Sequence, residues 1–435
     1  MTNQSVPVTE RKFLVPFVLI TTLFFLWAFG VNLNDILVPR FKTAFALNDF
    51  QSSFIQVAFF GGYFLAAFPA GRLMERIGYK RGIMVGLFLC ACGDLLFVPA
   101  SSVLVYWFFL FALFVMACGQ SFLEVAANPY VTILGPAESS EQRLNFAQSF
   151  NAVGAVVAML LGRFSILTGI EYTPEQRALL SAAQEHAYRV QQASTVKLPY
   201  VLIGAMFILT AVFIGLAHLP DVKERSSVSE PGAVPSWRRV LAEKHLVKGV
   251  FAQFFYVGAQ VGVGSFIIRF AQHTLGGLTA ADAWYYLFGH WFGFMIGRFG
   301  GSAIMSRIPP ARLLSIFSGG ALVCAIVALT PSRAVAVWAL VLIGFFHSIM
   351  FPTIFALGIK NLGPLTKRGS SLMVMAIVGG LFFPPIMGRI SDASNIQTAF
   401  IVPLICYVYI FYFGLVGYKP AVADLQRAAV EVQGS

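Results

Sequence analysis

A stripe of polar side chains interrupts one of the long apolar stretches of this sequence. Gln120, Glu124 and Asn128 are spaced four residues apart, so all three project from the same face of a helix. A charge at the centre of a membrane helix costs about 2.5–3.5 kcal/mol or more, so it usually faces a cavity and serves function. Pro129 follows directly and removes a backbone donor, which favours a bend beside the polar face. The stripe therefore predicts a functional acid, Glu124, within the membrane.

The chemistry expected of Glu124 is the uptake and release of a proton. Removal from water favours the neutral form of a carboxyl group, and a neutral acid can move with the protein without a net buried charge. Hydroxyl groups of a ligand can hydrogen-bond to either form of the acid, which would couple the proton to a hydroxylated ligand. The alternative is a purely structural hydrogen bond from Glu124 to a backbone carbonyl.

Further polar side chains lie at helical spacing within other apolar stretches. Amides hydrogen-bond pairs of hydroxyl groups, and aromatic rings pack on the apolar face of a sugar ring. We therefore expect a neutral sugar to contact Asn32, Asn128, Gln148, Asn151, Tyr256 and Gln260. For any one of these residues, a hydrogen bond between two helices is about as good an explanation.

A second acid, Asp35, lies three residues after Asn32 in the first apolar stretch. We expect it to be a proton-sensitive group that faces the outer half of a cavity and tunes or gates access to Glu124. The alternative is an interfacial acid close to Arg40 and Lys42.

Three other polar residues within apolar stretches have no assigned role. Asp94 could be a third acid, or it could pair with His290 or Arg163. His290 and His347 could relay protons, although a buried neutral histidine is usually just hydrogen-bonded.

The sequence shows no catalytic constellation. It has no Gly-rich phosphate loop, and its five cysteines lie in apolar stretches without metal-ligand spacing. We therefore expect no enzymatic activity, no metal and no cofactor, with a proton as the coupling ion.

Composition indicates an all-α membrane protein. Of the 435 residues, 58% are hydrophobic and only 11% are charged, against about 25% charged in soluble domains. Long apolar runs indicate membrane-spanning helices rather than a barrel. The net charge of +11 indicates positive inner loops rather than nucleic-acid binding.

Twelve membrane-spanning helices in two halves of six are expected. A linker at 221–247, rich in Ser, Pro and charge, separates the N-terminal half, 1–220, from the C-terminal half, 248–435. Residues 1–10 are expected to be loose, and a soluble loop is expected after the fifth span. The predicted spans are about 13–38, 51–70, 82–99, 103–134, 144–168, 199–219, 249–271, 281–305, 313–329, 335–359, 370–389 and 398–418.

The distribution of positive charge predicts that both termini are cytoplasmic. With that orientation most of the 30 Lys and Arg residues fall in inner segments, and we count Arg143, Arg298 and Arg368 among them. We expect a multi-pass protein of a bacterial inner membrane.

The two halves also resemble each other. Met74-Glu-Arg-Ile77 matches Met305-Ser-Arg-Ile308, and Leu134-Gly-Pro136 matches Leu362-Gly-Pro364. A parallel duplication of this kind places a substrate site between the halves, near the middle of the membrane.

The segment Gly71 to Arg81 resembles the loop 2–3 signature of the major facilitator superfamily, with Glu75 in place of the usual Asp. Gly71 would let two helices approach closely, and Glu75 would pair with a neighbouring helix. Arg76 would hold the cytoplasmic face. The alternative is a merely basic inner loop.

Over nearly its full length the chain resembles the fucose–proton symporter family. The motifs that carry this resemblance are Asn32–Leu37, Leu123–Pro136, Arg143–Asn151, Tyr256–Gln260 and Pro352–Gly363. The resemblance implies a twelve-helix major facilitator fold and assigns the functional acids of the family to Asp35 and Glu124. Related glucose/galactose carriers tend to have Gln at the second place, so Glu124 favours the proton-coupled fucose branch.

The resemblance implies proton-coupled uptake of a neutral monosaccharide, first of all L-fucose, by a carrier that works as a monomer in the lipid bilayer. Phe351 departs from it, because the fucose carriers have Tyr there and its hydroxyl donor is absent. The alternatives are a glucose or galactose carrier coupled to protons or sodium and, with less support, a sugar sensor that does not transport.

Overall fold

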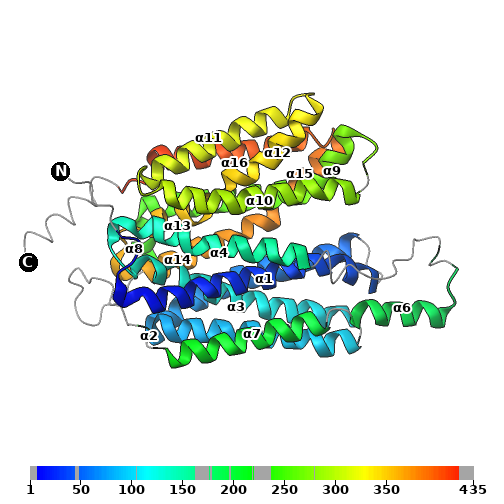
Figure 1. Cartoon of the computed structure of the whole chain (residues 1–435), viewed down its shortest axis with the longest axis horizontal. Coiled ribbons are helices and arrows are strands. Elements are labelled where there is room, and N and C mark those ends of the chain that lie inside the picture. Colours follow the sequence, from blue (N-terminus) through cyan, green and yellow to red (C-terminus); the bar gives the residue numbers. More distant parts are fainter. Residues whose placement is uncertain are drawn as a thin grey trace, which may run out of the picture.

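The computed structural model describes residues 7–44, 49–103, 105–161, 176, 179–194, 197–217, 219, 237–278 and 280–420. Within these ranges every regular element is a helix, and the helices run side by side as one elongated bundle (Figure 1). Helices of the N-terminal half lie in the lower part of that view and those of the C-terminal half in the upper part.

The N-terminal half contains five long helices. They are α1 (Leu14–Ala44), α2 (Asp49–Val103), α3 (Tyr106–Ile133), α4 (Ser140–Leu161) and α7 (Lys197–Leu216). The 55 residues of α2 form two helices joined at Gly78, whose φ of +79° and ψ of 172° are not helical. Glycine adopts this conformation at low cost, so Gly78 allows the sharp bend. The second predicted span therefore continues past 70 to this bend.

The C-terminal half is built from α9 to α16, and two of its crossings are interrupted. Each interruption replaces a predicted single span by two shorter helices. The helices are α9 (Lys244–Leu275), α10 (Ala280–Ile304), α11 (Pro310–Ala328), α12 (Arg333–His347), α13 (Met350–Ile359), α14 (Thr366–Met375), α15 (Gly379–Ala393) and α16 (Ile401–Tyr412).

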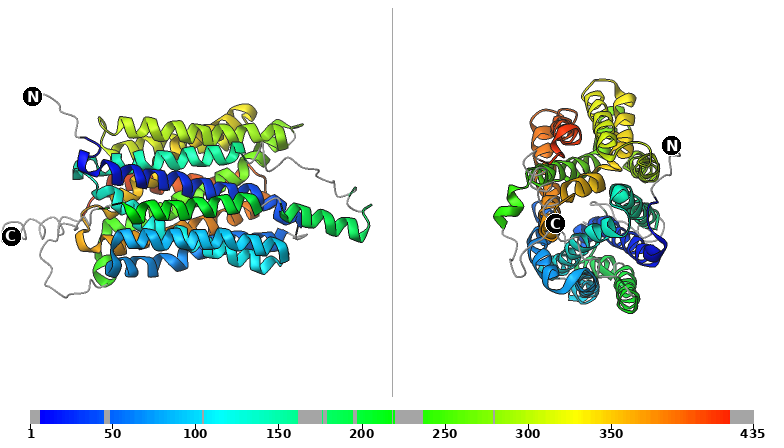
Figure 2. Two further views of the ribbon diagram at one scale, coloured as in Figure 1. Left: turned by 60° about the horizontal axis from the view of Figure 1, so that its bottom comes forward. Right: turned by 90° about the vertical axis from the view of Figure 1, so that its left-hand side faces the viewer.

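Two shorter helices connect or flank these crossings. The structure places α6 (Ala182–Ser194) where a soluble loop was expected, and α6 extends beyond the bundle (Figure 2). The second, α8 (Trp237–Ala242), belongs to the predicted linker, most of which lies outside the described residues. Single turns occur at η1 (Arg11–Phe13), η2 (Ala137–Ser139), η4 (Gly363–Leu365), η5 (Ala376–Val378) and η6 (Thr398–Phe400), with a π-turn at η7 (Phe413–Gly417).

The number of membrane crossings agrees with the predicted twelve. The described residues contain 10 helices long and apolar enough to span a membrane. One of these, over 54–103, has 50 residues and a length of ~75 Å, which with its bend suffices for two crossings of a core about 30 Å thick. The 25-residue α10 adds the twelfth.

The outer surface of the bundle is apolar, as a surface in contact with lipid must be. Large hydrophobic side chains are more than half exposed on helices of both halves, including Phe88, Trp107, Leu202, Val323 and Ile405. The chain enters α1 and leaves α16 at the same end of the bundle, on the left of Figure 1. We call this the terminus end.

Candidate functional site

The predicted polar stripe lies on α3 and is buried. Gln120 and Asn128 are fully buried, and Glu124 is 6% exposed. Tyr63 of α2 donates a hydrogen bond from its hydroxyl group to Gln120 Oε1, at 3.1 Å. The helix continues through Pro129 to Ile133. The stripe is therefore a polar surface held inside the bundle and not at its lipid face.

The Glu124 carboxyl group is only partly satisfied. Its Oε2 is buried and has no hydrogen-bond partner among the described residues. Arg298 and Tyr63 are the side chains that interact with it electrostatically. A buried carboxylate oxygen without a partner raises the free energy of the folded protein. Binding of a proton, or of a hydrogen-bond donor that enters the site, would remove this cost.

Arg298 is a buried cation between the two halves, although it was counted above among the positive residues of the inner segments. It belongs to α10, not to a loop, and is 3% exposed. Its Nε donates to the carbonyl of Ser348 at 2.7 Å. Its Nη1 donates to Gln148 twice, to the backbone oxygen at 2.6 Å and to Oε1 at 2.9 Å. The predicted span 281–305 already contained this charge, which was the signal that could have identified it.

A break between α12 and α13 explains how a guanidinium group is stabilised there. The first helix ends at His347 and the next begins at Met350, so nearby carbonyls are free of helical hydrogen bonds. The Ser348 carbonyl accepts from Arg298, and the His347 carbonyl accepts from the Tyr256 hydroxyl at 3.1 Å. The C-terminal end of a helix is also the negative end of its dipole, which favours a cation.

Hydrogen bonds connect this cation to the polar stripe. Gln148 Nε2 donates to Asn128 Oδ1 at 2.9 Å, so Asn128, Gln148 and Arg298 form a continuous chain across the two halves. Asn128 Nδ2 and Gln120 Nε2 are buried donors without partners in the described part of the chain. Such donors suit the oxygen atoms of a hydroxylated ligand.

The structure brings together some of the predicted sugar contacts and leaves others apart. Asn128, Gln148 and Tyr256 converge around Arg298. Asn32 donates from Nδ2 to the Ala28 carbonyl of its own helix, at 2.8 Å. Asn151 and Gln260 are half-buried on α4 and α9.

Asp35 belongs to α1, but its side chain lies outside the described part of the structure.

The remaining buried acid and the two histidines do not form the pair considered from the sequence. Both oxygens of Asp94 lack partners among the described residues, and Arg163 lies outside them. His290 is in contact instead with the Leu340 carbonyl, Nδ1 to oxygen 2.9 Å, and with the ring of His347. His347 Nε2 contacts the Tyr407 hydroxyl at 2.7 Å. The suggested pairing of Asp94 with His290 is therefore wrong.

The signature segment joins the two halves near the terminus end. Glu75 pairs with Arg368 of α14, with Nε 2.5 Å from Oε1 and Nη2 3.0 Å from Oε2. Arg368 is buried and so is not an open-loop charge. A Cβ atom on Gly71 would lie 1.8 Å from Ser371 Oγ, so this glycine permits the close approach of α2 and α14. Arg76 is exposed.

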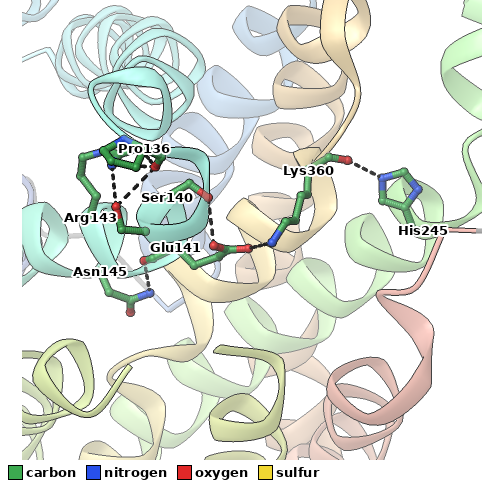
Figure 3. A network of polar contacts seen from close by, with 8 residues as sticks. Pro136, Ser140, Glu141, Arg143, Asn145, His245 and Lys360 are labelled. Carbon is green, nitrogen blue, oxygen red and sulfur yellow. Dashed lines mark hydrogen bonds and ion pairs between the residues drawn. The ribbon is translucent and has the colours of Figure 1, made fainter. Parts of the chain in front are cut away.

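The beginning of the described chain is fixed, contrary to the expectation that residues up to 10 are loose. Thr9 Oγ1 donates to the Leu134 carbonyl at 2.7 Å, and Ser139 Oγ donates to the Pro7 carbonyl at 3.0 Å. The fully buried Arg143 donates from Nη1 to the Val8 carbonyl at 2.9 Å and also contacts Pro136 (Figure 3). Arg143 is thus a structural cation and not an open-loop charge.

Comparison with known proteins gives consistent results. The model of the Major Facilitator Superfamily matches residues 19–381. The chain is 42% identical to the L-fucose-proton symporter of Escherichia coli over 408 residues, which covers 93% of each protein. It is also 42% identical to a glucose/galactose transporter of Brucella abortus over 402 residues, or 92% of this chain and 93% of that protein.

Solved structures agree with these sequence comparisons. A crystal structure of the E. coli fucose:proton symporter FucP superposes with a TM-score of 0.86 at 42% identity, covering 93% of this chain and 98% of that one. The proton:xylose symporter XylE shares the fold alone, with a TM-score of 0.71 at 13% identity. The chain therefore belongs to the major facilitator superfamily, in the group that contains the L-fucose-proton symporter and glucose/galactose transporters.

Proposed function

We propose that this protein takes up a neutral monosaccharide, first of all L-fucose, together with a proton. The observation that carries the proposal is the buried Glu124 carboxyl group, which has one unpartnered oxygen and shares a helix face with the buried amides of Gln120 and Asn128. This group can hold a proton, and the surrounding groups offer hydrogen bonds to hydroxyl groups without a surplus of negative charge. The relatives named as sugar symporters support the same reading.

In the proposed mechanism, Glu124 accepts the proton and Arg298 responds to its charge. When Glu124 is neutral, Arg298 remains with Gln148 and the freed carbonyl of Ser348. When Glu124 is ionised, attraction between opposite charges in a site of low dielectric draws Arg298 toward it. Sugar hydroxyl groups would bond to Asn128, Gln148 and the other polar groups of the site, with Asp35 tuning proton access.

The proton gradient supplies enough energy for accumulation. One charge that moves through about 100 mV releases ~2.3 kcal/mol. At ~1.4 kcal/mol for each tenfold ratio, this sustains roughly fifty-fold accumulation of sugar before any pH gradient is counted. We propose no cofactor beyond the proton and no enzymatic step.

Alternating access would come from rocking of the two halves around the central site. The contacts of Glu75 with Arg368 and of Gly71 with Ser371 join the halves near the terminus end. We propose that this end faces the cytoplasm of a bacterial cell and that the carrier works as a monomer in the inner membrane. Sugar would then enter from the opposite end in this conformation.

A glucose or galactose carrier is the second candidate, because a relative of that name is as similar as the fucose carrier, at 42% identity. Phe351 bears on the choice. Its ring centroid lies 6.2 Å from that of Tyr256. It lacks the hydroxyl donor of the Tyr that the fucose carriers have at this place, so this position does not favour L-fucose over galactose or glucose.

The test is the change in external pH when a sugar is added to lightly buffered, de-energised cells that express the protein. We expect alkalinisation with L-fucose that disappears in Glu124→Gln. Alkalinisation with D-galactose or D-glucose but not L-fucose would keep the mechanism and replace the substrate. Absence of a pH change with all three sugars would refute proton coupling, and sodium-dependent flux would be measured next.

A further inference from the structure

One face of α4 carries three side chains that bond to the C-terminal half. Glu141, Asn145 and Gln148 are four and three residues apart, so they follow one another along the same face of the helix. They span ~10 Å from the functional site to the terminus end. We call them the α4 row.

Each member of the α4 row has a partner across the interface. Glu141 Oε1 pairs with Lys360 Nζ at 2.5 Å, beyond the end of α13 (Figure 3). Asn145 Nδ2 donates to Thr353 Oγ1 of α13 at 3.0 Å. Gln148 accepts from Arg298 of α10, as described above.

The row is built into the interior and not laid on a surface. Asn145 and Thr353 are fully buried, Glu141 is 1% exposed and Gln148 is 3% exposed. The amide of Asn145 also donates to the Glu141 carbonyl at 2.9 Å, which fixes its orientation toward Thr353. Bonds in so dry an interface need not compete with water, so each favours the conformation in which the halves meet at this end.

We propose that the α4 row transmits occupancy of the sugar site to the closing contact at the terminus end, with Asn145 and Thr353 as positioning residues. This inference rests on the proposed function. A sugar hydroxyl group that bonds to Gln148 Oε1 competes with Arg298 for that oxygen and weakens the contact at the inner end of the row, where the bond to the Gln148 backbone oxygen remains. Fewer hydrogen bonds then join the two halves, since those of Asn145 and Glu141 remain and that of Gln148 is weakened. The free energy needed to separate the halves at the terminus end is therefore lower.

The bonds of the α4 row should shift the equilibrium between the form in which the halves meet at the terminus end and the form in which they are separated there. Loss of one neutral hydrogen bond changes an equilibrium by about fivefold. Thr353→Val removes the hydroxyl group and keeps the shape of the side chain. Thr210→Val is the matched control, because Thr210 is also a buried helical threonine but bonds to Met206 of its own helix, at 2.8 Å.

The experiment measures separation of the halves by labelling of a buried cysteine. Ser371→Cys places a thiol where α14 meets Gly71, at a position that is fully buried while the halves are closed. A bulky maleimide reacts with the purified protein in detergent, and protein without this substitution gives the background from the native cysteines. We expect Thr353→Val to raise the labelling rate about fivefold. Lys360→Gln, at a side chain that is 45% exposed, should also raise it. A rate equal to that of Thr210→Val would overturn the proposal.

Addition of sugar tests transmission itself. L-fucose should raise the labelling rate of the parent protein severalfold and should add little in Thr353→Val, because effects that act through one row are not additive. Independent, multiplying effects would overturn transmission through the row. A fivefold rise in Thr353→Val without any response to L-fucose, D-galactose or D-glucose would instead overturn the proposed substrate class and leave the closing role of the row in place.

Discussion

The ion pair of Glu75 and Arg368 should be worth much more than a surface salt bridge. Two hydrogen bonds join the side chains, at 2.5 and 3.0 Å, and these side chains are 19% and 5% exposed. Removal of one partner from a buried pair costs ~3–5 kcal/mol, because it leaves a charge without its counter-charge. Partial exposure of Glu75 puts the expected cost of Glu75→Gln at the lower limit, about 3 kcal/mol.

A double-mutant cycle measures the interaction itself. Glu75→Gln, Arg368→Met and the double variant would be compared by their free energy of unfolding in mixed micelles. We expect a coupling energy above about 1.5 kcal/mol, since the double variant removes both charges and so removes the penalty of the lone charge. A coupling energy below about 0.5 kcal/mol is the value of an exposed pair and would refute the reasoning that this contact holds the halves together.

Three further predictions concern the site and the interface. Glu124→Gln should abolish uptake driven by the proton gradient and spare exchange of internal for external sugar, as measured with labelled sugar in proteoliposomes; loss of both would contradict a proton-specific role. Arg298→Lys should lower uptake at least tenfold, because an ammonium group cannot make the forked contacts of a guanidinium group, while normal uptake would show that charge alone suffices. Gly71→Ala should lower the unfolding temperature, because its Cβ would lie 1.8 Å from Ser371 Oγ, and Ser371→Gly should restore part of the loss, since the Lys367 carbonyl 3.0 Å from the same Cβ remains; no recovery at all would place the strain elsewhere.

Much of the fold follows from local properties of the sequence. Apolar runs of about 20 residues define crossings because a bilayer requires that length, and the spacing of Gln120, Glu124 and Asn128 defines one buried face. The bend at Gly78 and the break after His347 are local exceptions. Hydropathy averaged over a window does not detect the break after His347, because the apolar character continues through it, whereas the charged residues of 72–81 do interrupt the apolar run around Gly78.

The partners across the interface could not be predicted from the sequence. Arg298 is 150 residues from Gln148 along the chain, and Arg368 is 293 residues from Glu75. The residue types alone do not specify which arginine bonds to which polar side chain, because the pairing depends on how the two halves pack. The position of Arg143 and Arg368 just outside the predicted spans was also misleading, since both side chains are buried.

The bonds of residues 7–9 bear on the order in which the protein is made. Thr9 donates a hydrogen bond to Leu134, which is 125 positions later in the chain. The Val8 carbonyl accepts one from Arg143, which is 135 positions later. At about 5–20 residues per second, a ribosome needs ~7–27 s to supply these partners. The first residues of the described chain can therefore settle only after the start of α4 has been made, long after they themselves have been synthesised. A fluorescent group placed there would report when the start of α4 has emerged and docked, and so would time this step of assembly during synthesis.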